Sequence, residues 1–153
     1  MIVFELLSDK NVEEMWKLEL ECFPEDPWSL KMFTAEIDNK ISVYIAARDE
    51  ENGRLAGYGG MWLMYDCADI TNIAVSPEYR REGLGSKILS VLENIAAERG
   101  MTSLALEVRE SNFKAIALYE KNGFIKNGLR KGYYKGKENA VLMIKEISQI
   151  DEK

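Results

Sequence analysis

The chain has 153 residues, of which 46% are hydrophobic, and it carries a formal net charge of −6 at pH 7. This length and apolar content suit one domain, which we expect to span residues 1–150. The acidic balance argues against a nucleic-acid-binding protein, because such proteins usually carry basic side chains that neutralise phosphates. The sequence has no histidine, which excludes a His-assisted nucleophile and removes the commonest catalytic zinc ligand.

The two cysteines, Cys22 and Cys67, lie far apart and form no CxxC unit. This spacing predicts neither a disulfide framework nor a metal site, and we expect buried free thiols. The first residues lack the basic start and apolar stretch of a signal peptide, and no later run is long enough to span a bilayer. We therefore expect a soluble cytoplasmic protein.

The N-terminal part reads as a strand followed by two helices. Residues 3–7 form the short strand, and the Asn11-x-x-Glu14 spacing resembles a capping box that opens a helix ending at Phe23. Ser29 is the candidate N-cap of the second helix. The predicted inward positions of the first helix are Val12, Met15, Trp16, Cys22 and Phe23, and those of the second are Leu30, Phe33 and Ile37.

The middle of the chain is rich in predicted strands. Residues 42–48 and 55–65 read as a hairpin joined by a turn, and residues 69–75 follow as another strand. A glycine-containing loop over residues 80–86 then opens a helix, from about 84 to 99, that Gly100 ends.

The C-terminal part begins with a short apolar strand over residues 103–108 and a helix over 112–121. Two last strands, 124–134 and 140–147, join through a turn at 136–139. The order of elements predicts an α+β or mixed α/β sheet with helices on its faces.

The loop before the predicted helix at residue 84 has the features of a phosphate site. The first N–H groups of a helix bind anions, Gly83 and Gly85 allow close approach, and Arg80 and Arg81 add positive charge. A pyrophosphate is the ligand that fits this arrangement. The alternative is a plain glycine turn with two solvated arginines. Neither the Rossmann nor the Walker spacing of glycines is present.

Glu107 lies inside the apolar strand at 103–108. Strand alternation places Leu104, Leu106 and Val108 on one face, and Glu107 with Arg109 on the other. A partly buried carboxylate there would suit a general base. The alternative is a carboxylate that is paired with Arg109 or solvated.

Tyr119 follows Asn112 by seven residues, so both side chains project from one face of the predicted helix at 112–121. A phenol at this place could protonate a leaving thiolate. From the residues alone, a core tyrosine with a satisfied hydroxyl and a helix-start asparagine are the stronger interpretations.

Together, Ile73-Ala-Val75, Arg80-x-x-Gly83-x-Gly85 and the block from Leu106-Glu-Val-Arg109 to Ala117-Leu-Tyr119-Glu-Lys-Asn-Gly-Phe124 resemble the GNAT superfamily. The closest likeness is to the bacterial ribosomal-protein alanine N-acetyltransferases, and it covers nearly the whole chain. The superfamily's pyrophosphate signature is Q/R-x-x-G-x-G/A. The resemblance implies the GNAT fold, a mixed, mostly antiparallel central sheet flanked by helices on both faces.

The resemblance also implies acetyl-CoA as cosubstrate, with no metal. Residues of the strand would hold the pantetheine arm, and the loop would hold the pyrophosphate. The implied cofactor-binding residues are Ile73, Ala74, Val75, Arg80, Arg81, Glu82, Gly83, Leu84, Gly85, Ser86 and Asn112.

By the same resemblance, Glu107 would accept the proton of the substrate ammonium and Tyr119 would donate one to the departing thiolate. Trp28, Tyr133 and Tyr134 would bind the acceptor, which would attack directly in a ternary complex. One departure is the insertion Glu25-Asp26 before Pro27-Trp28, which leaves the peptide preference open.

The acceptor implied by the resemblance is a protein N-terminal α-amine, with the N-terminal alanine of a small-subunit ribosomal protein expected first. A polyamine, an antibiotic or another small amine is an alternative, because the cofactor motif says nothing about the acceptor. A non-catalytic acyl-CoA-binding regulator and a plain interaction domain are further alternatives. We expect no direct nucleic-acid or membrane binding, and leave monomer and homodimer open.

Overall fold

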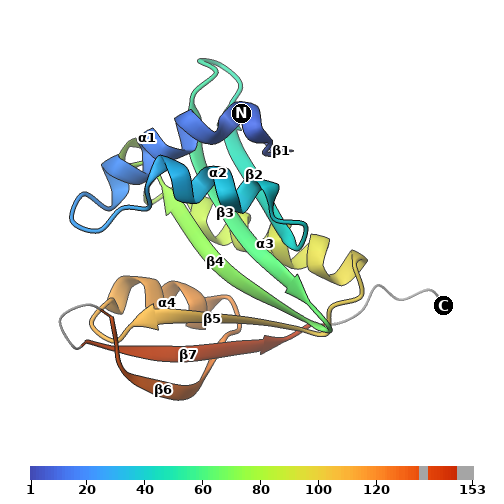
Figure 1. The fold of residues 1–153 in the computed structure, drawn as a ribbon, viewed down its shortest axis with the longest axis vertical. Helices are drawn as coiled ribbons and strands as arrows, with labels where there is room; N and C mark the ends of the chain where they lie inside the picture. Colours follow the sequence, from blue (N-terminus) through green and yellow to red (C-terminus); the bar gives the residue numbers. More distant parts are fainter. Residues whose placement is uncertain (135–137, 148–153) are drawn as a thin grey trace.

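A computed structural model describes residues 1–134 and 138–147 and shows a seven-stranded sheet with helices on both sides (Figure 1). Two short 3-10 turns, Asp9–Asn11 and Pro77–Tyr79, accompany the longer elements. In chain order these are β1 (Ile2–Leu6), α1 (Val12–Cys22), α2 (Leu30–Asp38), β2 (Ser42–Asp49), β3 (Leu55–Met64), β4 (Cys67–Val75), α3 (Leu84–Glu98), β5 (Ser103–Arg109), α4 (Phe113–Lys121), β6 (Ile125–Tyr134) and β7 (Glu138–Glu146). None of these helices is long and apolar enough to cross a membrane.

The strands lie in the order β1-β2-β3-β4-β5-β7-β6. Among the described strands, β4 and β5 are the one parallel pair, and α3 makes the crossover between them. All other neighbours are antiparallel. The predicted mixed, mostly antiparallel sheet is therefore confirmed.

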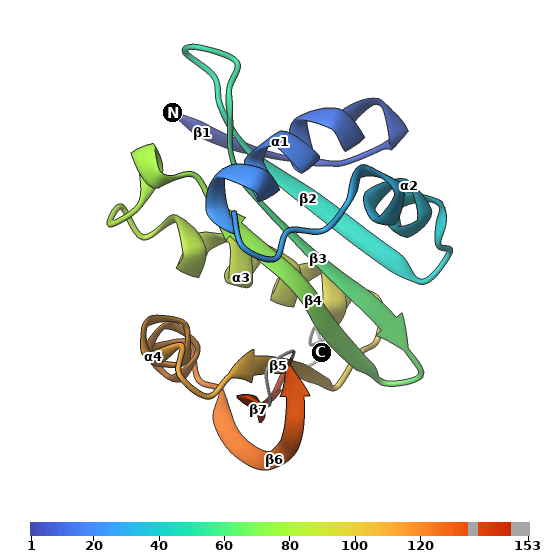
Figure 2. The same cartoon turned by 60° about the vertical axis from the view of Figure 1, so that its left-hand side comes forward.

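The helices divide between the two faces of the sheet. In Figure 2, α1 and α2 cover one face of β2 to β4, while α3 and α4 lie on the opposite side. Buried side chains form two clusters accordingly, one under α3 and α4 and a smaller one under α1 and α2. Gly59 lets α3 approach the sheet closely, because a Cβ there would lie 2.5 Å from Cγ2 of Ile88.

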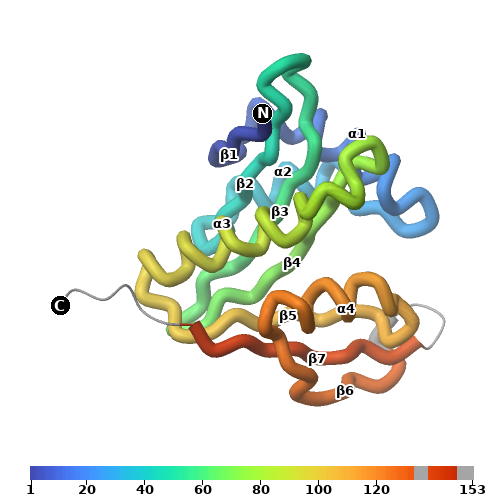
Figure 3. The backbone as a smooth tube through the Cα atoms, turned by 180° about the vertical axis from the view of Figure 1, so that it is seen from behind, coloured from blue at the N-terminus to red at the C-terminus, as the bar shows by residue number. Residues whose placement is uncertain are grey.

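Strands β4 and β5 pair over only part of their length. Their register runs from Cys67 opposite Ser103 to Ile70 opposite Leu106, although both strands continue further. Beyond that point the two strands diverge, as the views from the front and from behind both show (Figures 1 and 3). A bulge in β4 coincides with this divergence, since Thr71 has no partner in β3. We call the place beyond Ile70 and Leu106 the strand fork.

Some details differ from the sequence prediction. Asn11 and Glu14 do interact, but side chain to side chain at 2.8 Å, because Asn11 already has helical dihedrals after the 3-10 turn and caps no backbone N–H of α1. Phe23 and Leu30, expected to face inward, are about 40% exposed, since both stand at helix ends beside the α1–α2 loop. Ser29 does cap α2, accepting from the Met32 N–H at 3.1 Å. Residues 136 and 137 of the turn predicted at 136–139 lie outside the described residues. The prediction was wrong for Glu138 and Asn139, which already belong to β7, where Glu138 pairs with Tyr134.

Candidate active site

A cavity of about 530 Å³ opens at the strand fork. Its walls come from the outer part of β4, the end of β5, helix α4, the start of α3 with the loop before it, and α1 with the loop that follows it. Sequence-predicted residues from distant segments meet in it, and these are Trp28, Ile73, Ala74, Val75, Arg80, Gly85, Glu107, Asn112 and Tyr119.

A second cavity of about 550 Å³ continues from the first along the start of α3. Gly83 is the N-cap of α3 and has a left-handed backbone, with φ of 75°, as does Arg81 with φ of 70°. Such a turn directs the first N–H groups of the helix outward, where they have no intrahelical acceptor. The cavity walls also carry Arg80 and two cations that the sequence analysis did not single out, Lys114 and Lys121 of α4. The pocket is therefore cationic.

The remaining residues predicted to bind the cofactor differ in whether they line a cavity. Ser86 lines the second cavity, and its hydroxyl accepts from Asn122 Nδ2 at 3.0 Å. Leu84 also borders this cavity but is only 4% exposed, packed in the core. Glu82 is exposed and lines neither cavity. Asn112 caps α4 by accepting from the Ala115 N–H at 3.1 Å.

Glu107 projects from β5 on the face that carries α1 and α2, as alternation predicted; Leu104, Leu106 and Val108 are buried on the other face. Its side chain is 25% exposed, and Oε2 lies 3.5 Å from Nε of Arg130 on β6. Asp69 on β4 stands nearby: burial raises the pKa of the Asp69 carboxyl, the charge of Glu107 raises it further, and Arg130 lowers it. Asp69 and Arg130 carry no signal in the sequence for this role, because their proximity to Glu107 depends on strand pairing.

Tyr119 lines the first cavity from helix α4, whereas Glu107 lines it from strand β5. Its ring packs edge-on against Phe124, with ring centroids 5.8 Å apart. The half-buried phenol thus has a fixed ring position beside the same cavity as the Glu107 carboxylate.

The α1–α2 loop closes the third side of the cavity. Trp28 of this loop stacks near Phe33, with centroids 5.3 Å apart, and its backbone N–H donates to Glu19 Oε2 at 2.9 Å. Glu19 is only 2% exposed and also accepts a short hydrogen bond from the Tyr58 hydroxyl. Burial raises the pKa of the Glu19 carboxyl, and these hydrogen bonds partly offset the rise. Nothing in the helical pattern of α1 indicated a buried carboxylate here.

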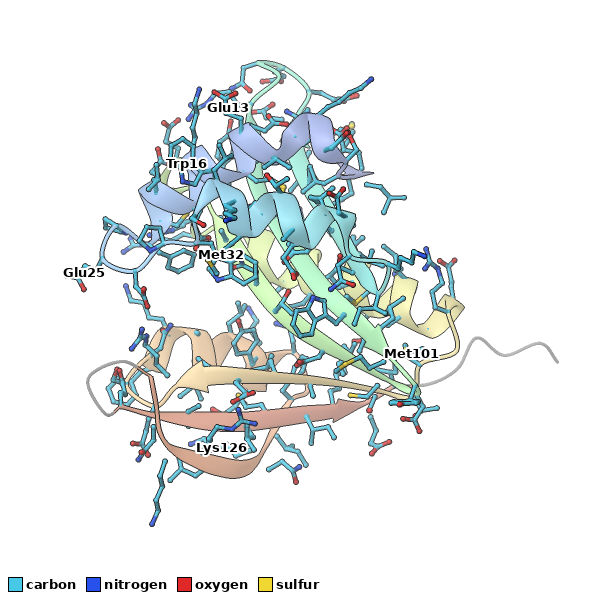
Figure 4. All side chains as sticks on the ribbon, in the orientation of Figure 1. Glu13, Trp16, Glu25, Met32, Met101 and Lys126 are labelled. Carbon is cyan, nitrogen blue, oxygen red and sulfur yellow. The ribbon has the colours of Figure 1, made fainter. Side chains whose placement is uncertain are left out.

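Glu25 and Asp26 of this loop, which the resemblance marks as an insertion, have different surroundings. Glu25 is exposed at the tip of the loop and points away from the sheet (Figure 4). Asp26 Oδ2 lies 3.3 Å from a guanidinium nitrogen of Arg109, whose other nitrogen is 3.4 Å from Glu138. These groups line a further cavity of about 670 Å³ beside the first. Through Arg109, Asp26 is thus linked to Glu138 of β7 across this cavity.

Tyr133 and Tyr134 belong to β6 by their backbone, but their side chains lie outside the described residues. Cys22 and Cys67 are free thiols, as predicted, but they are half-buried and not fully buried. The Cys22 thiol donates to the Val75 carbonyl at 3.3 Å, and burial raises its pKa.

Comparison with known proteins gives a consistent result. Residues 12–124 match the acetyltransferase (GNAT) family. The [ribosomal protein bS18]-alanine N-acetyltransferase of Escherichia coli (strain K12) is 40% identical over 125 residues, covering 80% of this chain and 82% of that protein. The Haemophilus influenzae protein of the same name is 39% identical over 147 residues, covering 94% and 97%. The crystal structure of the E. coli ribosomal-protein-S18-alanine N-acetyltransferase superposes with a TM-score of 0.90 at 34% identity, covering 99% of this chain and 97% of that one.

Proposed function

This chain belongs to the acetyltransferase (GNAT) family, and we propose that it transfers the acetyl group of acetyl-CoA to the N-terminal alanine of ribosomal protein bS18. One observation carries the proposal. A carboxylate, Glu107, and a phenol, Tyr119, line one cavity that continues into a cationic pocket at the start of α3. The groups that would serve as base, acid and anion site in amine acetylation are thus contiguous.

The residues of both cavities fit acetyl-CoA. Beyond Ile70, the edge of β4 is no longer covered by β5, so backbone groups of Ile73 to Val75 can pair with the amides of an extended pantetheine arm. The start of α3 and the cations Arg81, Lys114 and Lys121 would hold the phosphates. When bound, acetyl-CoA supplies an activated acetyl thioester.

Glu107 and Tyr119 would divide the proton transfers. An amine attacks only in its neutral form, and the Glu107 carboxylate would take the proton that the acceptor ammonium must lose. The Tyr119 hydroxyl would give a proton to the sulfur that leaves. Nε of Arg130 lies 3.5 Å from Glu107 Oε2, so a cation stands beside the carboxylate that would act as the base. No covalent enzyme intermediate is needed, which agrees with the absence of histidine from the sequence.

The acceptor would approach along the α1–α2 loop. Trp28 forms part of the wall there. Among the residues that the structure describes, the neighbouring cavity carries the carboxylates of Glu25, Asp26 and Glu138 beside one arginine, Arg109. This charge balance suits a cationic acceptor such as a basic protein N-terminus. The wall residues are therefore consistent with a peptide that extends outward from the amine.

The test is acetyl transfer from labelled acetyl-CoA to peptides that differ in their first residue, run beside spermidine and free lysine. We expect the bS18 N-terminal peptide beginning with alanine to have the highest kcat/KM, with serine and threonine variants next. Faster turnover of spermidine or lysine than of every peptide would refute the proposal and assign the enzyme to small amines.

A further inference from the structure

Asn72 carries a buried amide nitrogen in the wall of the cavity. Its Nδ2 atom is inaccessible to solvent and makes no hydrogen bond of normal length and angle with any residue that the structure describes. Buried polar atoms of this kind are rare in native proteins and call for an explanation. Asn72 lines the same cavity as Glu107 and Tyr119, so a ligand of that cavity is a candidate for the missing partner.

The strand fork places Asn72 and Glu107 on either side of the cavity. Asn72 stands two residues beyond Ile70, the last residue of β4 that pairs with β5, and Glu107 stands one residue beyond Leu106. Both face the side of the sheet that carries α1 and α2: Asn72 pairs with Gly60, where an added Cβ would strike the ring of Tyr44 in the cluster under these helices. The two side chains therefore flank the cavity from adjacent, diverging strands.

Glu19 fixes the direction of the Asn72 amide. The Glu19 carboxylate is held by Tyr58 and by the Trp28 N–H, and it lines the same cavity as Asn72. The side chain of Asn72 lowers the pKa of that carboxyl, in agreement with this placement. The nitrogen of the amide must face Glu19, because the amide oxygen would be repelled by a carboxylate. An amide nitrogen carries two hydrogens, so one can face Glu19 while the other remains for a ligand in the cavity.

A carbonyl oxygen is the partner that such a hydrogen selects. In a protein N-terminus, the α-amine and the first carbonyl are attached to the same carbon. The ε-amine of lysine and the amines of spermidine have no carbonyl at that place. A carboxylate for the ammonium and an amide donor for the adjacent carbonyl together recognise this unit, and a site built to hydrogen-bond a group discriminates against analogues that lack it.

We propose that Asn72 donates a hydrogen bond to the first carbonyl oxygen of the acceptor peptide and thereby selects α-amines, with Glu19 as the residue that positions its amide. This inference rests on the proposed function, because it requires a peptide acceptor. It adds a specificity-determining residue from β4 to the base and acid of β5 and α4.

The test compares two acceptors on the wild-type enzyme and on Asn72→Ala. One acceptor is an alanine-initiated peptide, and the other is the same peptide with an (E)-alkene in place of the first peptide bond, which removes the carbonyl oxygen and adds no charge. For the wild type we expect kcat/KM to fall about 10-fold on the alkene, as for the loss of one good hydrogen bond. For Asn72→Ala we expect the ratio of kcat/KM on the normal peptide to kcat/KM on the alkene to be about 2-fold or less, because kcat/KM falls on the normal peptide and not on the alkene.

Two variants guard this result. Asn72→Ser keeps a hydrogen-bond donor in a shorter side chain, and its ratio of kcat/KM between the two acceptors should lie between those of the wild type and Asn72→Ala. This variant also replaces Asn72→Ala in the test if the alanine variant does not fold. Tyr44→Phe removes buried hydrogen bonds to Glu36 and Thr71 on the same face without lining the cavity, and should keep the wild-type ratio. Acetyl-CoA affinity, measured by calorimetry, should be unchanged in Asn72→Ala.

Three outcomes would overturn the inference. An equal loss on both acceptors would mean that Asn72 serves the acetyl group or the fold, and unchanged rates on both would mean that it contacts nothing. A wild-type ratio near one would mean that the first carbonyl is not recognised. Failure of the proposed function looks different, since the wild type would then prefer spermidine or lysine to every peptide.

Discussion

Gly83 and Gly100 stand at the two ends of α3 and form a matched pair for testing the cofactor pocket. Both have left-handed backbones, with φ of 75° and 84°, and in both cases an added Cβ would meet no atom within 4 Å. Gly83 precedes the helix in the cationic pocket, whereas Gly100 follows the helix at the other end. Valine at either position therefore meets backbone strain and no steric clash, but only one of the two positions adjoins the pocket.

The strain sets the expected magnitude. A left-handed conformation costs a non-glycine residue about 1–2 kcal/mol, and a β-branched residue avoids it strongly. For a chain of this size, that loss lowers Tm by about 2–8 °C. If residue 83 relaxes out of the left-handed region, the first N–H groups of α3 turn away from the phosphates. Loss of even one hydrogen bond to a charged group, at about 1.5–3 kcal/mol, weakens binding by at least about 10-fold.

The assay pairs thermal unfolding followed by circular dichroism with calorimetric titration of acetyl-CoA. Gly83→Val and Gly100→Val should lower Tm to a similar extent. Acetyl-CoA affinity should fall at least about 10-fold in Gly83→Val and stay at the wild-type value in Gly100→Val. Unchanged affinity in a folded Gly83→Val protein, or an equal loss in both variants, would refute the assignment of this pocket to the phosphates.

The other predictions concern proton transfer and pH. The Glu107→Gln variant should bind acetyl-CoA normally, but its kcat should be about 10²- to 10⁴-fold lower than that of the wild type. This loss should be smaller at high pH, where the acceptor amine is already neutral. The Tyr119→Phe variant should have a lower kcat with little change in KM. Near-full turnover of both variants under chemistry-limited conditions would contradict these roles. Hydrogen bonds from Arg48 hold the pKa of the Glu14 carboxyl below its ordinary value near 4.5. The ionised carboxylate therefore stabilises the folded protein above that pH, and this contribution is lost as the pH falls through the lowered pKa of the folded state. Urea unfolding of Glu14→Gln should show a deficit of up to about 1 kcal/mol at pH 7 that vanishes in acid, because the pair is partly exposed; a pH-independent deficit would contradict this.

The sequence was most informative where interactions within a short segment determine its structure. The glycines and arginines before α3 predicted a turn and an anion site, and the structure places a left-handed Gly83 and a cationic cavity there. The alternation around Glu107 also predicted the correct face of β5. In each case, the interactions that decide the structure join residues only a few positions apart.

Features that depend on pairing between distant segments could not be predicted in the same way. Glu19 sits in the middle of α1, and only its contacts with Tyr58 and Trp28 explain why a carboxylate is buried there. Asp69 comes near Glu107 because β4 and β5 happen to share this register. The bulge at Thr71, which directly precedes Asn72, is likewise a property of how β3 and β4 pair. The sequence predicted Glu107 and Tyr119 as candidate reacting groups, but the polar groups around them could be found only from the strand pairing.

The parallel pairing of β4 and β5 explains why two separate segments form one site. Each strand is followed by a helix, so the start of α3 follows β4 and the start of α4 follows β5. Because the strands are parallel, both helix starts and both strand ends lie at the same edge of the sheet. Gly83 and Asn112 therefore border the same continuous space, and Tyr119 reaches it from two turns along α4. The divergence of the strands at the fork then lets that space pass between them. A ligand held on the α3 and α4 side can in this way present its reactive end to an acceptor held under the α1–α2 loop, with Glu107 at the junction.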